Sequence, residues 1–313
     1  MRKIAIMGKT EVSLIVVIIV LMAVFSGFGA NFFSYYNLSN LLKQAAISGI
    51  IAIAATIVII SGGIDLSVGS ITGMSSILVA ILMARYNFSI WLAIVIPIIL
   101  CTIIGLYNGI VISQFRVPPF IATLGTMTMV RGGIELISEA KTIVGVYPTF
   151  ASFSTEAIFG IPKMAYIWIF SAILVAVILK YTIFGRNIFA IGCNEEVARL
   201  SGINTKNTIC AIYALSGFLC GIAGVVLTSR LASAVPTGGQ GYELSSIAAA
   251  VIGGASLSGG QGSILGTFLG TFLITLITNG GIHLGINPFV MDIVTGAIIT
   301  IAVVLDQLRR RGP

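Results

Sequence analysis

Few side chains in this sequence could carry out bond-making chemistry. The ionisable residues inside its apolar stretches are Asp65, Arg131, Glu135 and Asp292. The chain has one histidine, and its four cysteines show no C-x-x-C spacing, so neither a zinc site nor a disulfide framework is expected. No nucleophile can be matched with a base, and no series of acids and histidines could relay protons. The sequence therefore predicts no metal site and no catalytic centre.

The few charges inside apolar segments need a partner or a polar cavity, because burying a charge in a membrane is costly. Arg131 and Glu135 are spaced i, i+4 on one predicted helix, which favours a mutual ion pair, with contact to a solute as the alternative. Asp65 follows a Gly-Gly pair and is interpreted as a helix cap, and Asp292 is expected to pair with a neighbouring helix.

A nucleotide-binding motif is present only in part. Gly8, Lys9 and Thr10 match the end of a phosphate-binding loop, but Lys3 replaces the first glycine and no strand is predicted before it. We therefore expect that the chain does not hydrolyse ATP, and that any ATP-driven step needs a separate subunit.

The elements that must position these residues are membrane helices. Of 313 residues, 57% are hydrophobic and 9% are charged, whereas a soluble domain has about 25% charged residues. A soluble chain could not hide so much apolar surface, and intrinsic disorder is excluded by the same numbers. The apolar residues form continuous runs instead of alternating, which indicates helices.

The apolar runs predict about ten transmembrane helices, since a spanning helix needs about 20 apolar residues. The longer runs are 12–29, 45–61, 90–113, 164–184, 207–228 and 288–305. The shorter or glycine-interrupted runs are 70–84, 118–136, 244–258 and 262–279. We expect an all-α polytopic bundle that forms a single transmembrane domain over residues 1–313.

The distribution of Lys and Arg predicts the orientation. With the N-terminus in the cytoplasm, most cationic residues fall in inside segments, including Arg309–Arg311. Both termini are therefore expected in the cytoplasm, and Met1–Thr10 is interpreted as the start of an uncleaved first helix. The net charge of +7 is assigned to these anchors, and no nucleic-acid partner is expected, because no basic stripe is interleaved with aromatics.

Two connections between spans are long. Residues 138–163 are predicted outside the membrane, and residues 185–206 in the cytoplasm. The second connection contains a predicted short helix, 194–200. Asn194 fits its N-cap, acidic residues occupy its first turn, and Gly202 fits its C-terminal stop.

Glycine shows two further patterns. Pairs and triplets spaced by four residues, such as Gly262, Gly266 and Gly270, favour close helix packing within the bundle, or alternatively between two protomers. The pattern G-G-x-x-L-S-x-G occurs at 62–69 and again at 253–260. Glycine-interrupted elements at matching places point to a translocation pathway, with chance similarity as the alternative. Both copies are predicted on the cytoplasmic side.

Several short segments occur in a characteristic order across nearly the whole chain. They are Asn31–Phe33, Asn37–Leu38, Ser61–Ser70, Phe120–Leu124, Arg131–Gly132, Gly185–Arg186, Gly192, Asn194–Glu195, Ala198–Asn204, Pro236–Thr237, Gly241–Leu244 and Gly253–Gly260. Together they resemble the permease subunits of bacterial ABC sugar importers of the ribose type.

This resemblance implies partners. Two permease subunits, identical or related, would form the pore in the bacterial cytoplasmic (inner) membrane. A separate ATPase subunit would use ATP and Mg²⁺ to drive transport, and an extracytoplasmic binding protein would deliver a ribose-like monosaccharide. The chain itself would be a multi-pass permease that binds no cofactor and catalyses no reaction.

The resemblance also implies site residues. Residues 192–204 are similar to the coupling helix that docks into the ATPase, with a plain amphipathic connector as the alternative. The residues implied to dock are Gly192, Asn194, Glu195, Glu196, Ala198, Arg199, Leu200 and Gly202. Cys193 departs from the small residue expected in the family, which should hardly disturb docking.

The solute pathway is expected to be wet and weakly binding, because a deep site would slow release. Candidate pathway residues are Asp65, Ser67, Thr123, Thr126, Thr128, Ser256 and Ser258. The main alternative function is an ion-coupled secondary transporter of a small polar solute, with Asp65 and Asp292 as its coupling acids. A passive channel and a membrane enzyme fit less well. A pentose, a hexose, an inositol and a nucleoside all stay open as cargo.

Overall fold

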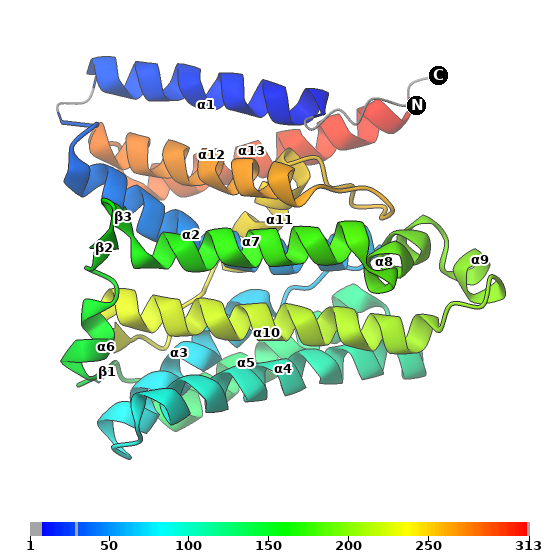
Figure 1. The fold of residues 1–313 in the computed structure, drawn as a ribbon, viewed down its shortest axis with the longest axis horizontal. Helices are drawn as coiled ribbons and strands as arrows, with labels where there is room; N and C mark the ends of the chain where they lie inside the picture. The colour runs from blue at the N-terminus through cyan, green and yellow to red at the C-terminus, as the bar shows by residue number, and fades with distance from the viewer. Residues whose placement is uncertain (1–7, 29–30, 312–313) are drawn as a thin grey trace.

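The computed structural model describes residues 8–28 and 31–311, and most of them are helical (Figure 1). The elements are α1 (Lys9–Phe28), α2 (Tyr35–Ile60), α3 (Val68–Ala84), α4 (Ile90–Phe115), α5 (Pro119–Ser138), β1 (Ile143–Val144), α6 (Pro148–Ser152), β2 (Ala157–Ile158), β3 (Ile161–Pro162), α7 (Lys163–Tyr181), α8 (Ile183–Cys193), α9 (Glu195–Leu200), α10 (Thr205–Leu231), β4 (Ser233–Ala234), α11 (Tyr242–Ile252), α12 (Ile264–His283) and α13 (Pro288–Arg311). In the described ranges, 7 helices are long and apolar enough to span a membrane. The expected all-α polytopic membrane bundle is confirmed.

Each predicted apolar run lies on a helix, but some bounds differ. α2 begins at Tyr35, well before the predicted run, because Ser34 caps it by accepting a hydrogen bond from the Asn37 amide at 3.3 Å. The run 244–258 was expected to be one span. Instead α11 ends at Ile252, and turns at 253–263 lead into α12. Apolar composition marks where a chain is buried, whereas caps and glycines set where a helix stops.

Helix α8 is an element that the sequence interpretation placed in a connecting loop. The Thr182 side chain caps it by accepting a hydrogen bond from the Gly185 amide at 3.1 Å. Only one side of α8 is buried, at Gly185, Ile188 and Ile191. Such a one-sided pattern gives no continuous apolar run, so a search for spans misses it.

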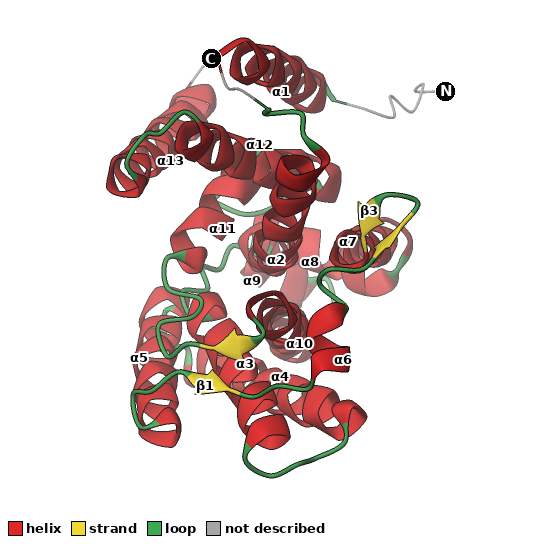
Figure 2. Ribbon diagram, turned by 90° about the vertical axis from the view of Figure 1, so that its left-hand side faces the viewer, coloured by secondary structure: helices red, strands yellow, loops and turns green. Residues whose placement is uncertain are grey.

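The core lies around α2 and α10, which occupy the centre of the bundle when it is viewed along its length (Figure 2). Ile47, Ile50 and Ile57 of α2 are fully buried. The Trp168 ring of α7 stacks on Phe268 of α12 with centroids 3.8 Å apart. By contrast, α1, α4 and α7 keep many large apolar side chains exposed, as expected for helices that face lipid.

The four-residue glycine spacing serves close packing inside the bundle. Gly105 of α4 and Gly217 of α10 face each other, so that a Cβ atom on Gly105 would lie 3.0 Å from the Gly217 Cα. Gly266 and Gly270 of α12 lie in the same way against Gly253 and Ala249 at the end of α11. These contacts confirm packing within one chain for both sets.

The two ends of the bundle differ. At one end, called the β1 end, β1 pairs antiparallel with β4, and β2 with β3, next to α6. At the other, called the α9 end, α8 and α9 project (Figure 1). The first turn of α1 and the last turn of α13 lie toward this same end. Met1–Met7 of the predicted N-terminal anchor and the side chain of Asp292 lie outside the described part of the chain.

Candidate functional site

Helix α9 is a short helix with both ends capped. The Asn194 Oδ1 atom accepts a hydrogen bond from the Val197 amide at 3.0 Å, as its sequence position predicts. Gly202 follows the helix with φ of +88°, and the Ile203 amide donates to the Ala198 carbonyl at 3.1 Å. The predicted N-cap and C-terminal glycine stop are confirmed. The caps make α9 a defined element although it has only 6 residues.

The surface of α9 mixes charged and apolar side chains. Ala198 is buried and anchors the helix, while Glu195, Glu196 and Arg199 are exposed. Arg199 Nε donates to Glu196 Oε2 at 3.1 Å, and this pairing holds the pKa of Glu196 below its ordinary value and raises the pKa of Arg199. The side chain of Leu200 is 73% exposed and that of Val197 57%. Sequence reasoning missed Val197, although its apolar type in a polar connection was a signal.

Gly192, just before α9, lies where three segments meet. The Gly260 amide donates a hydrogen bond to the carbonyl of Ile60, the last residue of α2, at 2.8 Å. Gly192 fits against this bond so closely that a Cβ atom on it would collide with both the Ile60 oxygen and the Gly260 nitrogen. A Cβ on Gly259 would lie 2.9 Å from the Gly62 Cα and 3.0 Å from the Gly192 Cα. We call Gly62, Gly192, Gly259 and Gly260 the glycine junction.

The junction explains where the repeated G-G-x-x-L-S-x-G pattern lies. Its first copy starts after α2 and its second after α11, and both copies reach the same point at the α9 end. Gly62 and Gly259 have φ of +84° and +81°, a conformation that other residues rarely adopt. Each copy therefore supplies a glycine in the left-handed conformation, at which two main-chain segments can make direct contact.

A buried polar network begins within the first copy, at Asp65 and Ser67, and extends to side chains of α4, α5 and α10. Asp65 Oδ1 accepts hydrogen bonds from the Ser67 amide at 2.9 Å and from its hydroxyl at 2.5 Å, and Oδ2 accepts one from Ser216 at 3.1 Å. The Asn108 amide group donates to the Ser67 hydroxyl at 2.9 Å, and Thr126 donates to Asn108 Oδ1 at 2.6 Å. All five side chains are buried. We call these five side chains the Asp65 network. Its hydrogen bonds satisfy the carboxyl group of Asp65, which would otherwise be costly to bury.

Sequence reasoning found only part of this network. Asp65, Ser67 and Thr126 were candidates, and Thr123 joins them at the edge by accepting a hydrogen bond from the Leu66 amide at 3.2 Å. Asn108 and Ser216 were missed. Asn108 could have been noticed as an uncharged but strongly polar side chain within the apolar helix α4, whereas Ser216 has no distinguishing sequence signal.

The other candidate pathway residues lie elsewhere. Thr128 is exposed on α5, and its hydroxyl donates to the Leu124 carbonyl of its own helix at 3.1 Å. Ser256 and Ser258 belong to the turns after α11, next to the glycine junction. Ser256 is buried without a hydrogen-bond partner for its hydroxyl in the described structure, and Ser258 is exposed. The structure therefore separates the seven candidates into three places.

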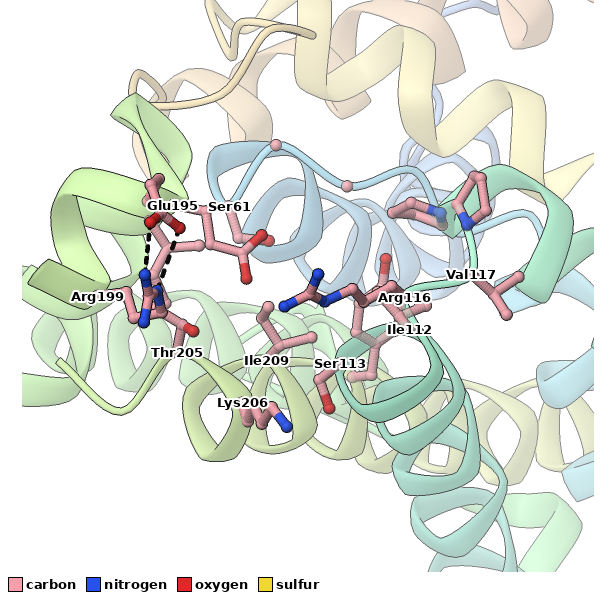
Figure 3. Close-up of a pocket in the computed structure, with 17 residues that line it drawn as sticks. Ser61, Ile112, Ser113, Arg116, Val117, Glu195, Arg199, Thr205, Lys206 and Ile209 are labelled. Atoms are coloured by element: carbon pink, nitrogen blue, oxygen red, sulfur yellow. Dashed lines mark hydrogen bonds and ion pairs between the residues drawn. The ribbon is translucent and has the colours of Figure 1, made fainter.

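An open cavity of about 460 Å³ separates α9 from the ends of α4 and α10 (Figure 3). Arg116 points into it from the end of α4, opposite Glu195 of α9, and Lys206 lies near its rim. Tyr213 contributes to its lining, and the hydroxyl of this side chain is buried beside Gly63 with no partner in the described residues.

The predicted ion pair between Arg131 and Glu135 is wrong. In the part of the chain that the structure describes, these side chains form no ion pair. Arg131 Nη1 instead donates to the Gly238 carbonyl at 2.7 Å, because α5 turns this side chain toward α3 while Glu135 is exposed. Among the described residues, no group of His, Cys, Asp or Glu side chains could hold a metal ion.

These features define a class of protein: a multi-pass helical membrane protein with a buried polar network and a capped helix projecting from one end. The chain belongs to the family described as "Branched-chain amino acid transport system / permease component", whose model matches residues 37–303. The resemblance to importer permeases is thereby confirmed.

Individual relatives are similar over most of their length. The chain is 42% identical to the ribose import permease protein RbsC of Bacillus subtilis (strain 168) over 290 residues, which cover 92% of this chain and 90% of the relative. It is 35% identical to RbsC of Escherichia coli (strain K12), covering 95% and 93%. Identity to the galactose/methyl galactoside import permease protein MglC of the same E. coli strain is 37%, covering 96% and 94%. No solved structure gives a significant match.

Proposed function

We propose that this chain is the membrane-embedded permease subunit of an ATP-driven importer, and that its cargo is a ribose-like monosaccharide. The observation that carries the proposal is the capped helix α9, which projects from the bundle and is joined through Gly192 to the end of α2 and to Gly260 in the turns after α11. The family and its sugar-importing relatives agree with this assignment. Those relatives support a monosaccharide cargo, because ribose and galactose are both neutral, polyhydroxylated sugars.

Helix α9 is the surface on which a separate ATPase subunit would dock. Its exposed apolar pair, Val197 and Leu200, would enter a groove on the ATPase, and the charges of Glu195, Glu196 and Arg199 would fix the orientation. ATP and Mg²⁺ would be bound by that partner, so the permease needs no cofactor or catalytic residue. The α9 end would then face the cytoplasm, together with both ends of the chain.

Movement of α9 would reach the pathway through the glycine junction. Gly192 touches the end of α2, and the Asp65 network begins three residues after Gly62. A displacement of α9 into the cavity beside it would therefore shift the loop that holds Asp65. We propose that Thr128 faces the solute path directly, that Asp65, Ser67, Thr123 and Thr126 shape it from behind, and that Ser256 and Ser258 move with the junction.

Two further partners complete the importer. A binding protein outside the membrane would deliver the sugar at the β1 end, where the strand pairs and α6 form the largest ordered loop region. A second permease subunit, a copy of this chain or a related one, would complete the pore. The whole assembly would lie in the cytoplasmic membrane of a bacterium.

Reconstitution tests the proposal. The chain is expressed with the ATPase and the binding protein of its importer, and the complex is placed in liposomes. We expect accumulation of labelled ribose or galactose only when ATP and loaded binding protein are both supplied. Accumulation by the permease alone without nucleotide, or uptake that an uncoupler abolishes while ATP persists, would overturn it in favour of ion-coupled transport.

A further inference from the structure

Helix α11 is too short to cross a bilayer. α11 has 11 residues, which corresponds to about 16 Å at 1.5 Å per residue, about half of a bilayer core. The segment before α11 leaves β4 at the β1 end and runs inward to the middle of the molecule (Figure 1). Non-helical backbone at this depth must be enclosed by protein or line a wet cavity.

The first turns of α3 and α11 meet. Gly69 is the second residue of α3 and Glu243 the second of α11, and a Cβ atom on Gly69 would collide with Glu243 Oε2 and with the Gly239 carbonyl. One turn further along α3, a Cβ on Gly73 would collide with the Gly238 carbonyl. The spacing of Gly69 and Gly73 therefore does not pack two helices. It opens a groove in α3 that holds residues 238–243.

This groove contains an acid with one uncompensated oxygen. Glu243 Oε1 accepts a hydrogen bond from the Gly241 amide at 3.1 Å and so caps its own helix. Glu243 Oε2 is buried and has no partner within the described structure. A buried carboxylate oxygen without a donor is costly, so a hydrogen-bond donor from outside the chain would stabilise it.

Arg131 lies at the same groove, and its guanidinium group has more hydrogen-bond donors than it uses within the described structure. Its Nη1 atom donates to the Gly238 carbonyl at 2.7 Å and lies 3.2 Å from where a Gly73 Cβ would be. Glu243 acts on it electrostatically, yet in the described structure the two side chains form no ion pair. A guanidinium has five N–H donors, so most of those on Arg131 are free to bind a ligand.

The exposed surface of α5 beside Arg131 includes polar and small residues. Thr128, Gly132 and Glu135 are all exposed on it, and Arg131 itself is partly exposed. A charged side chain inside a span faces a polar cavity or a partner rather than lipid. In the view along the bundle, α5 and α11 lie on the same side of the molecule (Figure 2).

We propose that Arg131 and Glu243 form a solute-contact site at the point where α3 and α11 begin, and that it binds the hydroxyl groups of the transported monosaccharide. This proposal rests on the proposed function and identifies the residues that would contact the transported sugar. One sugar hydroxyl can donate a hydrogen bond to a carboxylate while its neighbour accepts one from a guanidinium. A bound sugar would therefore supply the donor that Glu243 Oε2 lacks, without adding charge to the site. Because few groups are involved, the site would hold the sugar weakly and release it.

The test uses the whole importer in liposomes, with the binding protein saturated by sugar. Glu243→Gln keeps the shape and the helix cap but weakens the acceptor, and Arg131→Lys keeps the charge but removes the planar donor pair. Each should slow sugar uptake about tenfold, the loss of one charged hydrogen bond, while ATP hydrolysis changes less than twofold. Glu139→Gln, an exposed acid just beyond the end of α5, is the matched control and should leave both rates unchanged.

The outcomes separate the two proposals. If the wild-type complex shows no ATP-dependent sugar uptake, or accumulates leucine instead, both the proposed function and the proposed sugar-contact site are overturned. If the wild type imports sugar and Glu243→Gln imports it equally fast, only the site is overturned. Parallel loss of uptake, ATP hydrolysis and assembled complex in both variants would show a structural role and would also overturn it. Tenfold slower uptake by an intact, ATP-hydrolysing complex supports it.

Discussion

Gly192, which precedes helix α9, lies directly against the main-chain carbonyl oxygen of Ile60, the last residue of α2. The same oxygen accepts a hydrogen bond from the Gly260 amide at 2.8 Å. The projecting helix and the central helix of the core are therefore joined backbone to backbone, without a flexible side chain between them. Well-packed contacts of this kind transmit displacement rather than absorbing it.

A methyl group at this contact should disrupt coupling. In Gly192→Ala, the Cβ would collide with the Ile60 oxygen and the Gly260 nitrogen, so the three segments must separate. Overpacking of this kind costs about 1–3 kcal/mol. We expect ATP hydrolysis to continue while sugar uptake falls at least fivefold, measured as ATP consumed per sugar imported. Gly27→Ala on α1 is the control, since a Cβ there meets nothing within 4 Å. Unchanged stoichiometry in Gly192→Ala would show that the junction does not transmit movement.

Charge reversal on α9 should weaken docking of the ATPase. Glu195 and Glu196 are exposed and lie next to the apolar docking pair, so Glu195→Lys with Glu196→Lys would place like charges or unpaired charges at the interface. We expect affinity for the ATPase to fall about tenfold or more, measured by titration of the purified ATPase onto the permease in nanodiscs. Glu139→Lys, equally exposed but located at the opposite end beyond α5, should bind normally. Equal affinities for both variants would remove α9 from the interface.

Cys193 offers a direct probe of the same interface. It is exposed beside α9, whereas Cys101 and Cys220 are buried. A short cysteine-reactive crosslinker should therefore join the permease to the ATPase through Cys193, visible as a heavier band on a denaturing gel. Cys193→Ser should abolish that band while uptake continues. A band that persists in the serine variant, or none in an assembled complex, would contradict docking at this point.

The parts of this structure that could be predicted from the sequence are those set by local composition. The apolar runs predicted the helices, and the pattern of Asn194, acidic residues and Gly202 predicted α9 with its caps. The apolar runs and the caps of α9 both depend on residues that are close together in the sequence, so the sequence alone reveals them. The early start of α2 was not visible in the same way, since its first turns combine exposed tyrosines with the polar residues Asn37 and Ser39, which are buried by tertiary contacts.

Relationships between distant segments could not be predicted. The repeated glycine pattern was visible, but not that its two copies meet at Gly192, because this depends on how α2, α8 and α11 converge in space. Arg131 and Glu135 were paired by spacing, yet the Gly73 groove draws Arg131 toward Gly238. Nothing in the spacing of α5 alone reveals a groove on another helix.

The Asp65 network should contribute strongly to stability rather than to solute contact. Asp65→Ala removes the acceptor of three hydrogen bonds and leaves the Ser67 and Ser216 hydroxyls without that partner. Each bond to a charged group is worth about 1.5–3 kcal/mol, so the loss should be about 3 kcal/mol or more. Ser216→Ala alone should cost about 1–3 kcal/mol, whereas Thr128→Ala, exposed on α5, should change stability by less than about 0.5 kcal/mol. Unfolding in mixed micelles measures each difference.

The double variant decides whether Asp65 and Ser216 act as one unit. Once Asp65 is absent, the Ser216 hydroxyl has no carboxylate to donate to, so adding Ser216→Ala to Asp65→Ala should cost much less than it does in the wild type. We expect a coupling free energy of about 1 kcal/mol or more, because residues in one hydrogen-bond network are not additive. Strict additivity would mean that the two side chains do not interact in the membrane. In that case the Asp65 carboxyl group would be held by its two hydrogen bonds from Ser67.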